Sequence, residues 1–331
     1  MLYSTIINFV KSFFFFSNLQ MINYLFTKNI YIMKKSKSLL ILLLGLFVVF
    51  QGCEKKSLTE NNSNDKSAER KFNLGNIEIT NQYDNDGESI LCFNSLEDYE
   101  NAVSILSENN VNSFNQLTIK NNFVSMKNAF SVKSEKIPIE DDDIITSLLN
   151  KKGEIQIADK VFHLNFKNEK VEVISNLLKD KNETISYSFD DDVLAKVFKT
   201  NYSDNYSKGS YCSGSTKTTY MNSSGGRIDC KVKYLKLGIY YKLYAKISKA
   251  NSSAVKIGLT TIYYNKTKYQ NKAGCWTYSG NKSGTGNSYT LTAYSGTRRL
   301  KAYIIPINFW YEYFSSSDNK GLNMSCGTPN C

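Results

Sequence analysis

The stretch "RIDCKVKYLKLGIYYKLYAKISKA" at residues 227–250 alternates apolar and polar residues over two strand lengths. The apolar positions of the first length are Ile228, Cys230, Val232 and Tyr234, and those of the second are Ile239, Tyr241, Leu243, Ala245 and Ile247. Successive side chains of a strand point to opposite faces, so a period of two places each set on one face. The stretch therefore predicts two β-strands, each with one face on a core.

The same pattern continues toward the C-terminus, in segments separated by Gly, Asn and Ser. These segments are "AVKIGLTTIYYNK" (254–266), "GCWTYS" (274–279), "NSYTLTAYS" (287–295) and "RRLKAYIIPINFWYEYF" (298–314). No helical pattern is evident after Tyr211. Several short strands with turn signals between them are typical of an antiparallel sandwich. We expect residues 205–331 to form an all-β domain, a sandwich with a jelly-roll-like arrangement.

A ligand-binding face is predicted on the side of the second strand opposite its apolar set, where tyrosines alternate with lysines. Aromatic rings stack on flat apolar surfaces, and Lys or Arg attracts anions over a longer range. The candidate binding residues are Tyr240, Lys242, Tyr244, Lys246, Trp276, Arg298 and Arg299. The alternative interpretation is that Tyr and Lys are ordinary solvent-facing strand residues and that Trp276 belongs to the core.

Seven cysteines are present, and five of them lie after residue 205. These five are the disulfide candidates Cys212, Cys230, Cys275, Cys326 and Cys331. An exported chain occupies a compartment in which disulfides persist, so at least one bridge is expected among the five. Six cysteines, with Cys92 included, allow 15 full pairings. One option is a short loop closed by Cys326 and Cys331.

The preceding half, residues 72–200, predicts an α+β domain. Ser95 followed by Asp98 resembles a capping box, and Leu96, Tyr99 and Val103 then share one helical face. "EIQIADKVFHLNF" (154–166) predicts a hairpin that turns at Ala158-Asp159, and "KVEVIS" (170–175) a third strand. Acids at 140–143 precede a short apolar helix, where they favour its positive N-terminus; a calcium site is the alternative.

Charge divides the chain into the same two halves. Residues 53–200 carry 18 basic and 26 acidic residues, whereas residues 201–331 carry 18 basic and only four acidic residues. The basic half suits an anionic partner such as an envelope glycan or another polyanion. Basic charge with aromatics also suits nucleic acid, but export from the cytoplasm disfavours that partner.

The N-terminal region predicts export and a membrane anchor. "LLILLLGLFVVFQGCEKK" (39–56) follows Lys34, Lys35 and Lys37, and its apolar run is shorter than the roughly 20 residues that cross a bilayer. Gly52-Cys53 resembles the lipobox of bacterial lipoproteins, a resemblance that implies lipidation of Cys53 and cleavage before it.

The signal peptide would then be residues 33–52, with Met33 as the translation start. Residues 1–32 would be an upstream extension that is not translated. Residues 53–71 predict a flexible tether, because they are polar and nearly free of large apolar side chains. The resemblance implies a lipid-anchored protein of the outer membrane. Whether it faces the periplasm or the cell surface stays open.

A second resemblance covers residues 87–175. "FNSLEDYENAVSILS", "NNFVSMKNAF" and "IITSLLNKKGEIQIADKVFHL" resemble, in that order, segments of an uncharacterised lipoprotein family of the Bacteroidota. The match in the hairpin runs from Leu149-Asn150 through Gly153 to Asp159, with Ala158 where the family has glycine. The resemblance implies an envelope lipoprotein and no activity, since the family is a domain of unknown function.

No catalytic motif is evident in the sequence. The only histidine is His163, and no G-x-S-x-G, HExxH, Walker-type loop or G-x-G-x-x-G occurs. We expect no catalytic residue, no cofactor and no metal site, and a non-catalytic binding or structural module. The alternative is an extracytoplasmic carbohydrate-active enzyme that uses carboxylates.

Overall fold

The computed structural model describes the part of the chain that follows the predicted signal peptide and most of the tether. The described ranges are 69–83, 87–133, 138–139, 142–175, 183–199, 211–223, 226–254, 256–262, 267–313 and 316–331. They belong to one compact unit, Asn64–Cys331. Residues 1–32, the predicted signal peptide 33–52, Cys53 and the tether up to residue 68 lie outside the described residues.

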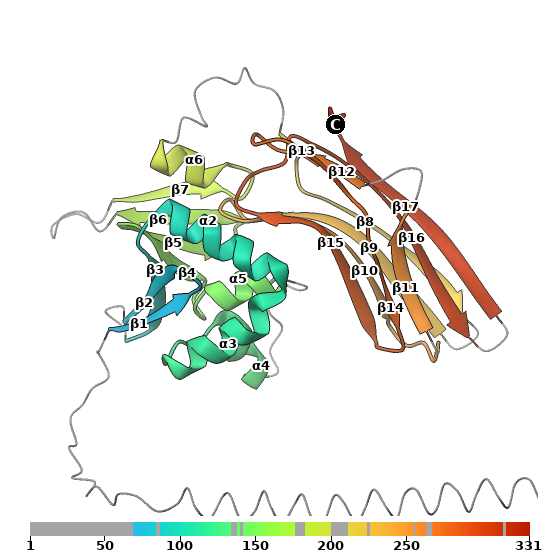
Figure 1. The fold of residues 1–331 in the computed structure, drawn as a ribbon, viewed down its shortest axis with the longest axis horizontal. Coiled ribbons are helices and arrows are strands. Elements are labelled where there is room, and N and C mark those ends of the chain that lie inside the picture. Colours follow the sequence, from blue (N-terminus) through green and yellow to red (C-terminus); the bar gives the residue numbers. More distant parts are fainter. Residues whose placement is uncertain are drawn as a thin grey trace, which may run out of the picture. The chain divides into compact units, whose positions relative to one another are not determined.

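Most of the described residues are in strands, which form several antiparallel sheets (Figure 1). The first sheet has seven strands that lie side by side in sequence order, and only its β3–β4 pair is parallel. Its members are β1 (Arg70–Leu74), β2 (Ile77–Tyr83), β3 (Ser89–Phe93), β4 (Glu154–Ile157), β5 (Lys160–Asn165), β6 (Lys170–Ser175) and β7 (Thr184–Ser188). The last two residues of the predicted tether, Arg70 and Lys71, belong to β1 and pair with β2, so the tether is shorter than predicted.

Helices connect the parallel pair, because parallel strands need a long crossover. They are α2 (Leu96–Ile105), the π-helical turn η1 (Leu106–Asn110), α3 (Val111–Lys120), α4 (Met126–Lys133) and α5 (Asp143–Leu148), and α6 (Val193–Phe198) follows β7. The predicted cap is present: the Ser95 hydroxyl accepts a hydrogen bond from the Asp98 amide at 3.0 Å. Tyr99 and Val103 are buried, as their helical spacing predicts.

The hairpin formed by β4 and β5 turns at Ala158 and Asp159, as predicted. Ala158 has a φ of 53°, a left-handed conformation that glycine adopts without steric cost. Ile155, Ile157, Phe162 and Leu164 are buried in this hairpin, whereas Val161 is only partly buried. This turn therefore carries alanine where the backbone favours glycine.

The second half of the described chain is a β-sandwich-like pair of sheets. One sheet has the order β15-β10-β9-β8, with β8 (Ser215–Ser223), β9 (Gly226–Lys236), β10 (Tyr241–Lys249) and β15 (Ser288–Gly296). The other has the order β13-β12-β16-β11-β14, and β17 also pairs with β16. Its strands are β11 (Lys256–Thr261), β12 (Thr267–Gln270), β13 (Cys275–Tyr278), β14 (Asn281–Gly284), β16 (Ala302–Tyr313) and β17 (Ser316–Cys326).

The predicted apolar sets of β9 and β10 lie in the sandwich core, except Ile239, which precedes β10 and belongs to the other core cluster with Tyr99 and Ile145. Ile228, Val232 and Leu243 are fully buried there, together with Ile257 and Phe309 from the facing sheet. The alternation in residues 227–250 thus identifies the inner face of the first sheet correctly.

Two disulfides tie the C-terminus to the sandwich. Cys212 bridges Cys326, and Cys275 bridges Cys331. The option of a Cys326–Cys331 loop is wrong, because each of these cysteines pairs with a residue far away in sequence. Cys230 is a free, buried thiol on the inner face of β9, so it is not a disulfide cysteine.

Candidate functional site

The predicted Tyr/Lys face of β10 is largely covered. Tyr240, Lys242 and Tyr244 are exposed by only 0%, 6% and 1%. Tyr240 and Tyr244 belong to the apolar cluster that also contains Tyr99 of α2 and Ile145 of α5. The prediction of a solvent-facing surface is wrong for these three residues, because the helices between β3 and β4 pack on the outer face of β10.

Asp142 explains why a lysine is tolerated in that layer. Its Oδ1 accepts hydrogen bonds from the amides of Ile144 and Ile145 and so caps α5. Its Oδ2 accepts one from the Tyr240 hydroxyl at 2.9 Å and lies 3.2 Å from Nζ of Lys242. Burial, reinforced by the Asp142 charge, raises the pKa of Tyr240. Asp142, the acid at the start of this helix, is thus a buried link between α5 and the side chains of Tyr240 and Lys242, whereas Glu140 and Asp141 lie outside the described residues.

Arg298 and Arg299 are occupied by contacts within the chain. Arg298 lies 3.7 Å from the carboxylate of Glu100 on α2. Arg299 donates hydrogen bonds to the backbone carbonyls of Cys212 and Asp190 and lies over the ring of Tyr211. Both arginines join segments that are distant in sequence, so their guanidinium groups serve packing in this structure.

Lys246 lies on the part of the outer face that the helices leave open. It is opposite Lys231 of β9, and these two lysines line a hollow of about 560 Å³. Arg227 of β9 and Tyr220 of β8 also line this hollow. Like charges directly across a sheet are unfavourable, but the lining also includes Asp229, which pairs with Arg227, so this remnant of the predicted basic face has mixed charge.

Trp276 is exposed, not core: 39% of its surface is accessible on β13. Its indole stacks on the ring of Tyr269 on β12, with centroids 5.6 Å apart and planes 20° from parallel. Tyr269 in turn packs against Tyr294 of β15, with centroids 5.2 Å apart. We call these three rings the aromatic patch.

The aromatic patch lines a hollow of about 340 Å³ whose lining comes mainly from β15, β13 and the end of β12. The other lining residues are Ser107, Asn271, Thr292, Ala293 and Ser295. Burial raises the pKa of both Tyr269 and Tyr294, so their hydroxyls remain neutral donors and acceptors at physiological pH. The described lining is uncharged and combines flat apolar rings with amide and hydroxyl groups.

The sequence identified Trp276 but missed Tyr269, Tyr294 and Asn271. The signal that could have found Tyr269 is the pairing of "TKYQ" (267–270) with "CWTY" (275–278), which places Tyr269 opposite Trp276. The position of Tyr294 depends on contact between the two sheets, which no local pattern reveals.

The Cys275–Cys331 disulfide fixes the strand that carries the indole. Cys275 is the residue before Trp276, and Gln270 pairs with Cys275 on the other side. The bridge therefore restrains β13, an edge strand with only one neighbour in the sheet order.

The single histidine of the sequence lies beside a carboxylate of the neighbouring strand. His163 on β5 lies 3.0 Å from the carboxylate of Glu172 on the neighbouring β6, a cross-strand pair. No group of three His, Cys, Asp or Glu side chains among the described residues could hold a metal ion. Within the described ranges, no helix is long and apolar enough to span a bilayer.

The chain has no counterpart in the comparisons with known proteins: no family model, no curated protein and no solved structure matches it. Any function must therefore be inferred from the geometry of this chain.

Proposed function

We propose that the protein is a non-catalytic binding module of the cell envelope that holds a glycan against the aromatic patch. The observation that carries this proposal is the exposed indole of Trp276, stacked on the half-buried ring of Tyr269, in a hollow whose described lining is uncharged. A sugar ring has an apolar face of C–H groups, which suits an aromatic plane, and hydroxyls around its edge, which need hydrogen-bond partners.

The polar groups of the hollow are of the kind that sugar hydroxyls need. Thr292 and Ser107 offer hydroxyls, whereas Asn271 is buried and its Oδ1 accepts from the Ala273 amide. No carboxylate is among the described residues of the lining, which favours binding over carboxylate-based hydrolysis at this site.

We place this module on the outer membrane through a lipid on Cys53, as the resemblance of Gly52-Cys53 to a lipobox implies. The two disulfides are compatible with an oxidising compartment. Membership of the Bacteroidota lipoprotein family, with its unknown function, is part of the same proposal. The proposal covers a protein that faces either the periplasm or the cell surface.

For the fold, we propose an α+β domain built on β1–β7 and its helices, followed by the antiparallel sandwich of β8–β17. Within the sandwich, β8, β9 and β10 follow one another in a single sheet, which supports a meander there more than the predicted jelly-roll-like arrangement. Both assignments could be tested by an experimental structure of the chain.

The glycan proposal is tested by screening the full-length chain in phosphatidylcholine nanodiscs against envelope glycans and peptidoglycan fragments at low and high salt. Because the lining is uncharged, a glycan bound by the aromatic patch should bind equally at both salt concentrations. Binding seen only at low salt would mean attraction by net charge alone and would contradict the proposal.

A further inference from the structure

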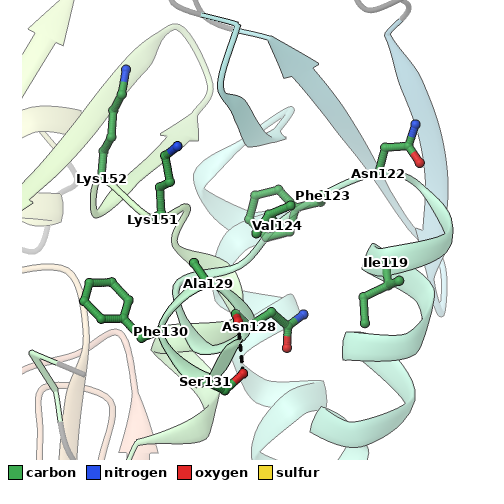
Figure 2. Close-up of a pocket in the computed structure, with 10 residues that line it drawn as sticks. All are labelled: Ile119, Asn122, Phe123, Val124, Asn128, Ala129, Phe130, Ser131, Lys151 and Lys152. Carbon is green, nitrogen blue, oxygen red and sulfur yellow. Dashed lines mark hydrogen bonds between the residues drawn. The ribbon is translucent and has the colours of Figure 1, made fainter. Parts of the chain in front are cut away.

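A second, much larger groove lies in the N-terminal half of the described chain, on the helices between β3 and β4. It has a volume of about 970 Å³, near the upper end of the range for ligand sites. Figure 2 shows ten described residues that line it, which come from the end of α3, the loop that follows, α4, and the turn before β4. They are Ile119, Asn122, Phe123, Val124, Asn128, Ala129, Phe130, Ser131, Lys151 and Lys152.

The walls of this groove expose apolar side chains that a folded domain normally hides. Ile119 is 57% exposed and Val124 is 51% exposed, and these are the two most exposed large apolar residues in the described part of the chain. Phe130 completes the apolar wall on α4. Large apolar side chains gathered in one concave site indicate a surface that is covered by a ligand or partner.

Polar groups occur at defined places around this apolar surface. Lys151 and Lys152 stand together at the rim, where they project away from the helices (Figure 2). Lys151 pairs with Glu88 but keeps about half of its side chain exposed. The amide nitrogen of Asn128, which lies across from Ile119 in Figure 2, is buried and has no hydrogen-bond partner among the described residues.

We propose that this groove binds the acyl chain of a long-chain fatty acid, with the carboxylate near Lys151 and Lys152. The apolar walls suit the hydrocarbon chain, and the lysine rim complements a single negative charge. This site is separate from the aromatic patch, which is lined by different residues, and it has a different ligand chemistry.

The loop of the groove is held in place by the fold itself. Asn122, in the turn that follows α3, has a φ of 58°, and the Phe123 amide donates to the Thr118 carbonyl at 3.0 Å. Ser125 forms an isolated bridge with Asn150, the residue before Lys151. The apolar wall and the lysine rim are thus joined by backbone pairing.

The test uses the full-length chain in phosphatidylcholine nanodiscs and a photoactivatable palmitic acid, with the labelled residues mapped by mass spectrometry. We expect labelling at Ile119, Val124 or Phe130 that excess oleate suppresses. Ala129→Trp should fill the groove and lower this labelling about tenfold. Ile185→Trp enlarges an exposed apolar residue on β7, outside the groove, and should leave the labelling unchanged.

A second variant keeps the apolar walls intact. Lys151→Gln with Lys152→Gln should weaken the binding of the fatty acid about tenfold, the effect of losing one charge-assisted contact, without weakening that of its methyl ester.

Labelling that is absent, that maps outside the groove, or that is equal in Ala129→Trp and Ile185→Trp would overturn the proposal. Equal labelling by acid and ester in the unsubstituted chain would overturn the assignment of a carboxylate ligand. A groove already occupied by another segment of the chain would stay unlabelled and overturn the proposal as well.

Discussion

The indole of Trp276 lies almost parallel to the ring of Tyr269, 5.6 Å away between centroids, on neighbouring antiparallel strands. Such cross-strand aromatic pairs hold each other in one orientation. Tyr269 is therefore expected to act as a support for the exposed ring rather than as the main contact of the glycan.

Substitution of Tyr269 tests this support. Tyr269→Ala should weaken glycan binding about fivefold to tenfold, because an aromatic pair contributes about 1 kcal/mol beyond burial of its area. Tyr269→Phe keeps the ring and should bind as the unsubstituted chain does. Both affinities can be measured by isothermal titration calorimetry, and an equal loss in the two variants would mean that the hydroxyl, not the ring, matters.

Asp142 should be one of the most sensitive positions for stability. Asp142→Ala removes the cap of α5 and leaves Lys242 buried without its carboxylate, so the free energy of unfolding should fall by about 3–5 kcal/mol. The matched control is Glu312→Ala, which breaks an exposed pair with Lys256 at 4.0 Å and should cost less than about 1 kcal/mol. Chemical denaturation measures both, and similar losses would show that the buried link is unimportant.

Ala158→Gly should stabilise the protein by about 1 kcal/mol, because alanine is strained at a φ of 53° and glycine is not. The opposite result is expected for Ala102→Gly in the middle of α2, where glycine should cost about 1 kcal/mol. Thermal unfolding distinguishes the two. A lower melting temperature for Ala158→Gly would mean that the turn does not carry this strain in solution.

The local elements of this fold follow from sequence because their causes are local. The cap at Ser95, the turn at Ala158 and the helix Val193–Phe198 each depend on residues within a few positions of one another. The prediction of an exposed face on β10 was wrong because the burial of that face has a cause distant in sequence. Asp142, which covers it, is 98 residues before Tyr240, and no period in residues 227–250 shows what packs on the second face.

The same limit applies to strand β17 and to the disulfides. β17 reads as a polar segment, "SSDNKGLNMSC", and becomes a strand because it pairs with β16 along its whole length. Cys212 and Cys326 are 114 residues apart and meet only once the sandwich is formed. For the site, Trp276 could be predicted, whereas its neighbours Tyr269 and Tyr294 required the arrangement of three strands.

Lys236 should contribute to the pH dependence of the free energy of unfolding. Its side chain is almost fully buried beside Asp190. Burial, with Arg299 nearby, lowers its pKa to about 8 from 10.5. Between about pH 8 and 10.5 the unfolded chain holds a proton that the folded chain has lost, so this lysine makes stability rise with pH in that window. Lys236→Met should therefore stabilise most below pH 8, with the gain fading toward pH 10.5.

Denaturant unfolding at several pH values between 7 and 10.5 measures this effect, within the window set by the pKa of Lys236. Lys282→Met, on the exposed strand β14, is the control and should change stability little at any of these values. A gain from Lys236→Met that is independent of pH would contradict a lowered pKa.

The central claim is that a glycan stacks on Trp276, and the most direct measurement compares Trp276→Ala with Tyr220→Ala. Tyr220 is the other exposed aromatic residue in the described ranges, 50% accessible on β8 and outside the hollow of the aromatic patch. With the best glycan from the screen, at high salt, calorimetry should show at least a tenfold loss of affinity for Trp276→Ala, about 1.4 kcal/mol, and no change for Tyr220→Ala. Equal affinities for the two variants would contradict the account.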